Sequence, residues 1–457
     1  MLHDGQDLAV STDEALVIAG IDQFTEGFLG YGPQVLDILK AADADPQCAL
    51  VQAYCAMLHL FLESREGLRQ AGPHVVTALQ HLENTGEREQ LFVEAIDAWF
   101  HEDVAGAIQI HEYLAEHYPR DLVSVKLCQY HHFNLGNAPG MLRVASKALE
   151  NNQANPHMHG MIAFGYEQCH LLEEAEAAAR TAIKLHRGEA WAHHALAHVL
   201  ETRGQVAEGI EFMESVSDTW EGLNSFMHTH NWWHLCLYYI ATEQFERVLD
   251  IYDRHIWGVW KEYSQDQIGA VSLLARLETA GVAVGDRWQD VADYLVARVD
   301  DHIQPFLDLQ YLYGLARAER PEAEALLESL RQHVEHAPGL TRTAWREVAL
   351  PAAHALLAHA QGDFDAAIRG LTTTLPRLQE IGGSHAQRGL FQELLLDAYL
   401  RSERLAPAQQ YLELEHQTRP GVPLTLRRLA RVYEDLDLPA RALAARRGHE
   451  ELHGRFH

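Results

Sequence analysis

Apolar residues recur at steps of three and four along almost the whole chain. This spacing places them on one face of a helix with 3.6 residues per turn, so it is typical of amphipathic helices. Alanine, leucine and glutamate are abundant, whereas runs of β-branched residues are rare. The pattern therefore predicts an all-α protein.

The middle of the chain also repeats itself with a period of 34 residues. Three residues of one copy recur at equivalent places in the next: Ala163, Glu167 and Glu174 as Ala197, Glu201 and Glu208. This period is that of the tetratricopeptide repeat, a pair of antiparallel helices that stacks on its neighbours. We therefore predict a tetratricopeptide-like helical-repeat superhelix, an α-solenoid whose concave face is lined by the first helix of each pair.

Small residues mark the places where the two helices of a repeat approach each other. In the two clearest copies these places hold Ala163, Ala175, Ala197 and Gly209. Weaker copies occur on both sides, so we expect about ten to twelve helix pairs in all.

The period is lost over 258–287. We therefore divide the chain into an N-terminal repeat region, 1–257, and a C-terminal repeat region, 258–457, within one continuous superhelix. The last helix, expected over 439–453, carries too many arginines for full burial and is predicted to be largely exposed.

Two pairs of histidines stand out among the thirty of the chain. His194 and His198 are four residues apart, and Glu201 follows three residues later, within an arc of about 60° on the helix. The next first helix carries His230 and His234 at the same spacing. Because neighbouring first helices lie about 10 Å apart, we expect the five side chains to converge in the concave groove of the N-terminal region.

Three interpretations of this cluster stay open. The five residues are candidate metal ligands, because imidazole and carboxylate groups suit zinc, iron or manganese. They are also candidate catalytic groups, because imidazole titrates near neutral pH. In the third interpretation they form a polar lining that orders the superhelix or binds a ligand. The metalloprotease motif HExxH is absent from both pairs.

Further candidate ligand-binding residues flank the cluster. His159 and Glu167 are expected at the same level one repeat earlier, and Trp233 lies beside the histidines. Asp253 and His255 can orient neighbouring imidazoles. Core packing is the alternative for the tryptophan, and a surface pair is the alternative for the last two.

The chain is strongly acidic, with 36 Lys and Arg against 65 Asp and Glu and a formal charge of −29. This balance disfavours nucleic acids and anionic membranes as partners. No apolar run has the ~20 residues that span a bilayer, and no signal peptide is indicated. A peptide, a protein or a small molecule is the expected partner, and self-association through the terminal repeats stays open.

The five cysteines are scattered and none forms a CxxC pair. We expect reduced thiols in a cytoplasmic protein.

Several segments resemble the tetratricopeptide repeat protein 38 family, in order from about Ile38 to Leu395. The matching segments are Trp191 to Val199 with Glu201 and Gly204, His230 to His234, Tyr252-Asp253 with His255-Ile256, Gly285 to Val291, Asp301 to Ile303, and Gly382 to Arg388. The resemblance implies a cytosolic repeat protein without an assigned activity. It adds Trp191, His302 and Arg388 to the ligand-binding candidates. Gln310 and His385 depart from the family pattern and are the weakest candidates for chemistry.

Two functions therefore remain open for the groove. In the first, a tetratricopeptide-repeat protein binds a peptide or small ligand in a His-rich concave groove. In the alternative, a metal-dependent or His acid–base enzyme uses the same groove as a closed pocket.

Overall fold

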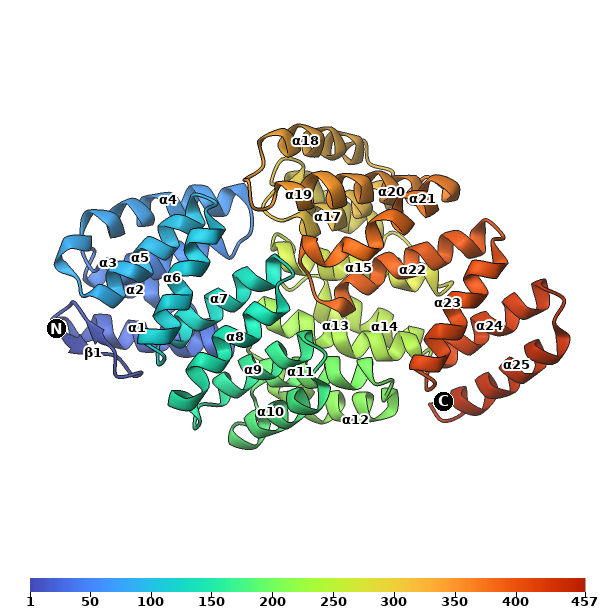
Figure 1. The fold of residues 1–457 in the computed structure, drawn as a ribbon, viewed down its shortest axis with the longest axis horizontal. Helices are drawn as coiled ribbons and strands as arrows, with labels where there is room; N and C mark the ends of the chain where they lie inside the picture. Colours follow the sequence, from blue (N-terminus) through green and yellow to red (C-terminus); the bar gives the residue numbers. More distant parts are fainter. Residues whose placement is uncertain (457) are drawn as a thin grey trace.

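The computed structural model describes residues 1–456, which are almost entirely helical (Figure 1). Two short strands, β1 (Leu2–His3) and β2 (Ala9–Val10), pair in antiparallel fashion before the first helix. The first twelve helices are α1 (Ala15–Gly30), α2 (Asp37–Ala44), α3 (Ala49–Leu60), α4 (Arg65–Gln80), α5 (Glu87–Phe100), α6 (Val104–His117), α7 (Leu122–Asn134), α8 (Ala138–Leu149), α9 (Pro156–Gln168), α10 (Leu172–Leu185), α11 (Ala190–Thr202) and α12 (Val206–Val216). The remaining helices are α13 (Ser225–Ala241), α14 (Phe245–Ile251), α15 (Ser264–Thr279), α16 (Arg287–Leu295), α17 (Pro305–Arg317), α18 (Glu322–His336), α19 (Arg342–Ala344), α20 (Leu350–Ala360), α21 (Phe364–Thr374), α22 (His385–Arg401), α23 (Leu405–Thr418), α24 (Pro423–Asp435) and α25 (Pro439–His453).

The helices follow one another as packed pairs, which confirms the predicted tetratricopeptide-like superhelix. Within residues 1–456 there are twelve pairs, from α1–α2 to α24–α25, with the short α19 as an additional turn. First helices of successive pairs also touch, in the order α9, α11, α13, α15, α17 and α20. Helices α9 and α11 begin 34 residues apart, at Pro156 and Ala190. The period in the sequence is therefore the period of the structure.

Small residues allow this close packing. Ala163, Ala175 and Ala197 are completely buried. A Cβ atom added to Gly209 of α12 would lie 2.4 Å from Cζ of Tyr238 in α13. Side chains larger than these alanines and this glycine would push the paired helices apart.

The superhelix folds back so that repeats far apart in the sequence meet. Figure 1 shows α22 beside α15, and the two helices are in direct contact. At the turn between α7 and α8, a Cβ atom on Gly136 would lie only 2.1 Å from the carbonyl oxygen of Gln379. The carboxylate of Glu63 accepts hydrogen bonds from Ser264 (3.1 Å) and Gln304 (3.0 Å). The array is therefore closed by direct contacts and is not an open spiral.

The apolar core extends along the folded-back superhelix. The largest cluster of buried apolar residues extends from Met141 to Leu424, and a second one lies among the N-terminal helices.

The division of the chain at residue 258 stays a prediction. Helix α25 buries only Ala442 and Ala445, so its predicted exposure is confirmed. Among residues 1–456, no helix is long and apolar enough to cross a membrane. All five cysteines are free thiols.

One histidine joins three helices of the N-terminal region. Nδ1 of His157, in α9, lies 3.0 Å from Oε1 of Glu189, which caps α11, and its Nε2 lies 3.5 Å from Oε1 of Glu26 in α1. Burial alone would lower the pKa of His157, but the two carboxylates outweigh it and raise the pKa to about 9.

This raised pKa predicts a loss of stability at alkaline pH. The stabilisation is complete below the ordinary pKa of 6.5 and is lost as pH rises through about 9, on the order of 3 kcal/mol. Urea unfolding between pH 6 and 10, followed by circular dichroism, measures it. In His157→Gln the dependence should be reduced, whereas His117→Gln, at an exposed position of α6, should behave like the wild type. Parallel curves for wild type and His157→Gln would contradict the assignment.

Candidate functional site

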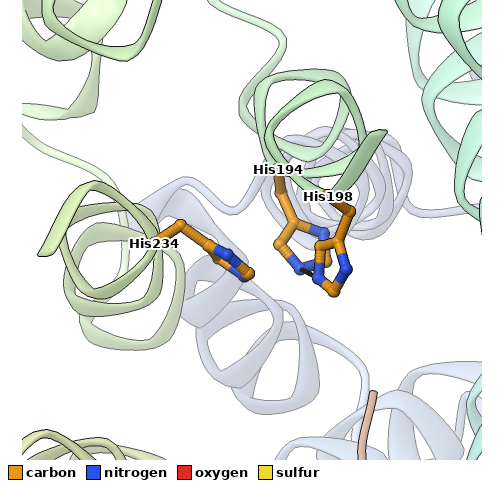
Figure 2. Close-up of side chains that lie close together, drawn as sticks. All are labelled: His194, His198 and His234. Carbon is orange, nitrogen blue, oxygen red and sulfur yellow. Dashed lines mark hydrogen bonds between the residues drawn. The ribbon is translucent and has the colours of Figure 1, made fainter. Parts of the chain in front are cut away.

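The structure brings four of the predicted histidines together. Helix α11 presents His194 and His198, and α13 presents His230 and His234. Nε2 of His194 lies 3.0 Å from Nε2 of His198 and 3.2 Å from Nε2 of His230. The ring of His234 is 4.5 Å from that of His198 and 4.8 Å from that of His194. Figure 2 shows His194, His198 and His234 directed toward one another.

The sequence of α11 explains why its histidines are buried. This helix contacts α9, α10, α12 and α13, and every residue of it from Ala192 to Leu200 is inaccessible. Alanines at 192, 195 and 197 allow the neighbouring helices to approach closely. Side chains on the face toward α13 therefore meet the histidines of that helix.

The carboxylate of the cluster is Glu167 and not Glu201. Oε1 of Glu167, in α9, lies 3.6 Å from Nδ1 of His198 and 3.2 Å from Nε2 of His385. Glu201 is instead 3.8 Å from Nη1 of Arg419, in the segment after α23. The two glutamates occupy equivalent places in successive repeats, so the earlier repeat supplies the group that approaches the histidines.

Burial keeps three of the four imidazoles neutral. It lowers the pKa of His230 to about 3 and those of His194 and His234 well below the ordinary value, with a further contribution from the neighbouring rings. Burial alone would raise the pKa of Glu167, but His198 and His385 outweigh it, so the pKa is lowered. Glu167 thus places a buried carboxylate beside the rings of His198 and His385.

Two tryptophans border the cluster. Trp191 stacks on His194 with ring centroids 4.4 Å apart, and Trp233 stacks on His230 at 5.6 Å. Arg388 of α22 donates to the carbonyl oxygen of Gly383. These three candidates lie at or near the histidines.

Four other candidates have partners elsewhere. Nε2 of His159 contacts the carbonyl oxygen of Gln153 at 2.8 Å. Asp253 forms an ion pair with Arg287, and the ring of His255 stacks on Trp232. His302 contacts Asp308 at 2.5 Å and Ser329 at 2.7 Å. The structure does not bring these side chains to the cluster.

Sequence reasoning ranked His385 low, although it belongs to the site. Its ring centroid is 5.0 Å from that of His198. It begins α22, where Ser384 and Gln387 form a capping box. The S-x-x-Q pattern was a usable signal for this helix start. The packing of α22 against α15, more than a hundred residues away in sequence, has no such signal.

A partly enclosed cavity of about 220 Å³ adjoins the histidines. Its lining includes His194 and His230. Ten of its 26 lining residues are aromatic: Phe28, Tyr31, Phe61, Tyr130, Phe133, Phe164, Trp191, Phe226, Tyr263 and Phe306. They come from the N-terminal, middle and C-terminal repeats. The closure of the superhelix is therefore what forms the cavity.

Lys126 and Glu63, which also line the cavity, are both held by hydrogen bonds within the protein. Lys126 donates to the carbonyl oxygens of Phe28 (2.6 Å) and Leu29 (3.1 Å) at the end of α1, and its ammonium lies 3.7 Å from the ring centroid of Tyr31. Burial lowers the pKa of Lys126 to about 7. Glu63 accepts hydrogen bonds from four side chains. Both groups are therefore engaged by other parts of the chain, and the two histidines share the polar part of the lining with uncharged amide and hydroxyl groups.

The fold and its repeats define this chain as a helical-repeat protein of the tetratricopeptide type. No family model matches the chain. A human IFIT1 dimer with PPP-AAAA aligns with 99% of this chain and 98% of its own, at 12% identity and a TM-score of 0.38. The yeast Tom70 crystal structure aligns with 96% of this chain and 84% of its own, at 12% identity and a TM-score of 0.26. Naa15/Naa10 bound to HypK-THB aligns with 96% of this chain and 63% of its own, at 13% identity and a TM-score of 0.25.

These matches correct one expectation. The expectation that nucleic acid is not a partner is contradicted by the matched IFIT1 structures, which hold PPP-AAAA and m7Gppp-AAAA. The exclusion relied on the net charge of −29. Net charge describes the whole surface and does not set the potential inside one groove.

Proposed function

We propose that this protein binds a small, largely apolar ligand in the aromatic cavity, with His194 and His230 contacting the ligand's polar group. The observation that carries the proposal is the convergence of ten aromatic side chains and two neutral imidazoles on one cavity. A volume of about 220 Å³ exceeds the ~150 Å³ that suffices for benzene. The ligand is therefore a compact molecule of one or two rings, which supports a small ligand over an extended peptide.

Further parts of the proposal rest on the sequence. The resemblance to the tetratricopeptide repeat protein 38 family is supported by the order of the shared motifs. Five free cysteines support a cytoplasmic location.

The pKa of the histidines bears on the enzymatic alternative, which is either acid–base catalysis or metal-dependent chemistry. A general base works best when its pKa is near the working pH. The pKa of His230, at about 3, makes this ring a weak base at neutral pH. Neutral imidazole is, however, the form that binds metals. The cluster therefore supports metal binding better than acid–base catalysis.

The proposed ligand site predicts that Phe226→Ala weakens the binding of phenol and indole by about tenfold. Phe226 lines the cavity and stacks on His230 at 5.3 Å, so its removal takes away apolar contact area. Ligand-observed NMR titrations of metal-free protein measure the affinities. Phe212→Ala is the matched control, because Phe212 is also half-buried but lies on α12, outside the cavity lining. Equal affinities in both variants, or no binding by the wild type, would contradict the proposal.

A further inference from the structure

Several buried polar atoms without hydrogen-bond partners are concentrated in the histidine cluster. They are Nδ1 of His194, Nδ1 of His198 and Nε2 of His234. A buried polar atom without a partner costs about 1 to 3 kcal/mol, and native proteins leave few of them. An ion held by Nε2 atoms would complete Nε2 of His234, and Nδ1 of His198 already faces the carboxylate of Glu167.

The spacing of the nitrogens fits a metal ion. Zinc binds imidazole nitrogen at about 2.0–2.1 Å, so two ligands in tetrahedral geometry lie roughly 3.3 Å apart. The Nε2 atoms of His194 and His198 are 3.0 Å apart. One ligand nitrogen from each of His194, His198 and His234 can be chosen so that all three lie within 4.8 Å of one another. Small side-chain rotations therefore suffice to surround one ion.

The charge of the cluster suits a cation as well. The three rings are completely buried, and imidazole is a common ligand of transition-metal ions. Behind His198 lies the buried carboxylate of Glu167, 3.6 Å from Nδ1. A carboxylate on the second nitrogen of a ligating histidine fixes its orientation and increases its basicity. Glu167 is thus placed as a positioning residue.

We propose that His194, His198 and His234 bind one transition-metal ion, with Zn²⁺ as the best match for three imidazole ligands, and that its open side faces the aromatic cavity. Of the three ligands only His194 lines the cavity, beside His230, so the ion would adjoin the cavity through this residue. Three histidines and one open position are the ligand set of catalytic zinc sites. The metal centre does not require that the proposed ligand binds.

The test uses full-length protein without a His tag, stripped of metal and titrated with Zn²⁺ against a chromophoric chelator. We expect one ion per chain. His198→Asn and His234→Asn should each weaken binding at least 100-fold, and Glu167→Gln should weaken it by about 10- to 100-fold. Co²⁺ replaces Zn²⁺ for spectroscopy: the wild type should show the strong visible bands of four-coordinate Co²⁺, and Glu167→Gln should shift them. Loss of folding alone would not produce such a shift.

His449→Ala is the control, because Glu243, His449 and His453 form another group that could hold a metal, near the C-terminus. This variant should bind Zn²⁺ like the wild type. His230→Gln should keep the one-to-one stoichiometry. Circular dichroism identifies variants that fail to fold, and each of the two asparagine variants then serves as the check on the other. Wild type that binds no Zn²⁺, or binding that survives in the double variant His198→Asn/His234→Asn, would overturn the proposal.

Discussion

Replacing Arg88 by alanine is expected to lower the free energy of unfolding by about 3 to 5 kcal/mol. Arg88 in α5 is 5% exposed, and its Nη1 lies 2.8 Å from Oδ2 of Asp121, which is completely buried. Its Nη2 also donates to the carbonyl oxygen of Ala9, in β2. The substitution would leave the Asp121 carboxylate buried without its partner. Urea unfolding at neutral pH, followed by circular dichroism, measures the loss.

The matched control is Arg120→Ala. Arg120 pairs with Asp7 at the same distance of 2.8 Å, but the two side chains are 46% and 72% exposed. Water screens the charges of an exposed pair, so this variant should unfold nearly like the wild type. Similar losses in both variants would show that burial does not set the strength of the Arg88 pair.

Gly136→Ala is expected to destabilise the protein by about 3 to 4 kcal/mol and to weaken the closure of the superhelix. Gly136 has a φ of 65°, which costs a residue with a side chain roughly 1 to 2 kcal/mol. Its added Cβ would also lie 2.1 Å from the carbonyl oxygen of Gln379, so the two turns must separate. Thermal unfolding measures the loss of stability, and phenol binding reports the state of the cavity.

Gly362→Ala separates the two contributions. Gly362 occupies the corresponding turn between α20 and α21 with a φ of 81°, but nothing lies within 4 Å of its added Cβ. This variant should lose only the roughly 1 to 2 kcal/mol of backbone strain and keep phenol binding unchanged. If both variants lose the same amount, the contact with Gln379 does not hold the turns together.

The local part of the architecture could be predicted from the sequence. A 34-residue period fixes helix lengths and the packing of each pair on the next, because these contacts are close in sequence. The i, i+4 spacing of His194 and His198 likewise predicts which helix face they share. The repeat register also predicts that the histidine pairs of α11 and α13 face each other.

The details of the site and the cavity depend on contacts between repeats far apart in the sequence, which the 34-residue period does not specify. Glu167 and Glu201 are equivalent in the repeat, and only the packing of α22 determines that Glu167 meets His385. The cavity joins Phe28 to Gln387, so its existence requires the whole course of the chain. The expectation about nucleic acid rested on the net charge alone, and composition carries no positions.

The contacts that close the superhelix also constrain the number of repeats. In an open solenoid each repeat touches only its neighbours, so a helix pair can be gained or lost while the others keep their surroundings. Here the lining of one cavity comes from residues between Phe28 and Gln387. An extra pair inserted between them would move one wall away from the other and separate Gly136 from Gln379. Insertions in the outer loops or at the two ends of the array would leave this cavity intact.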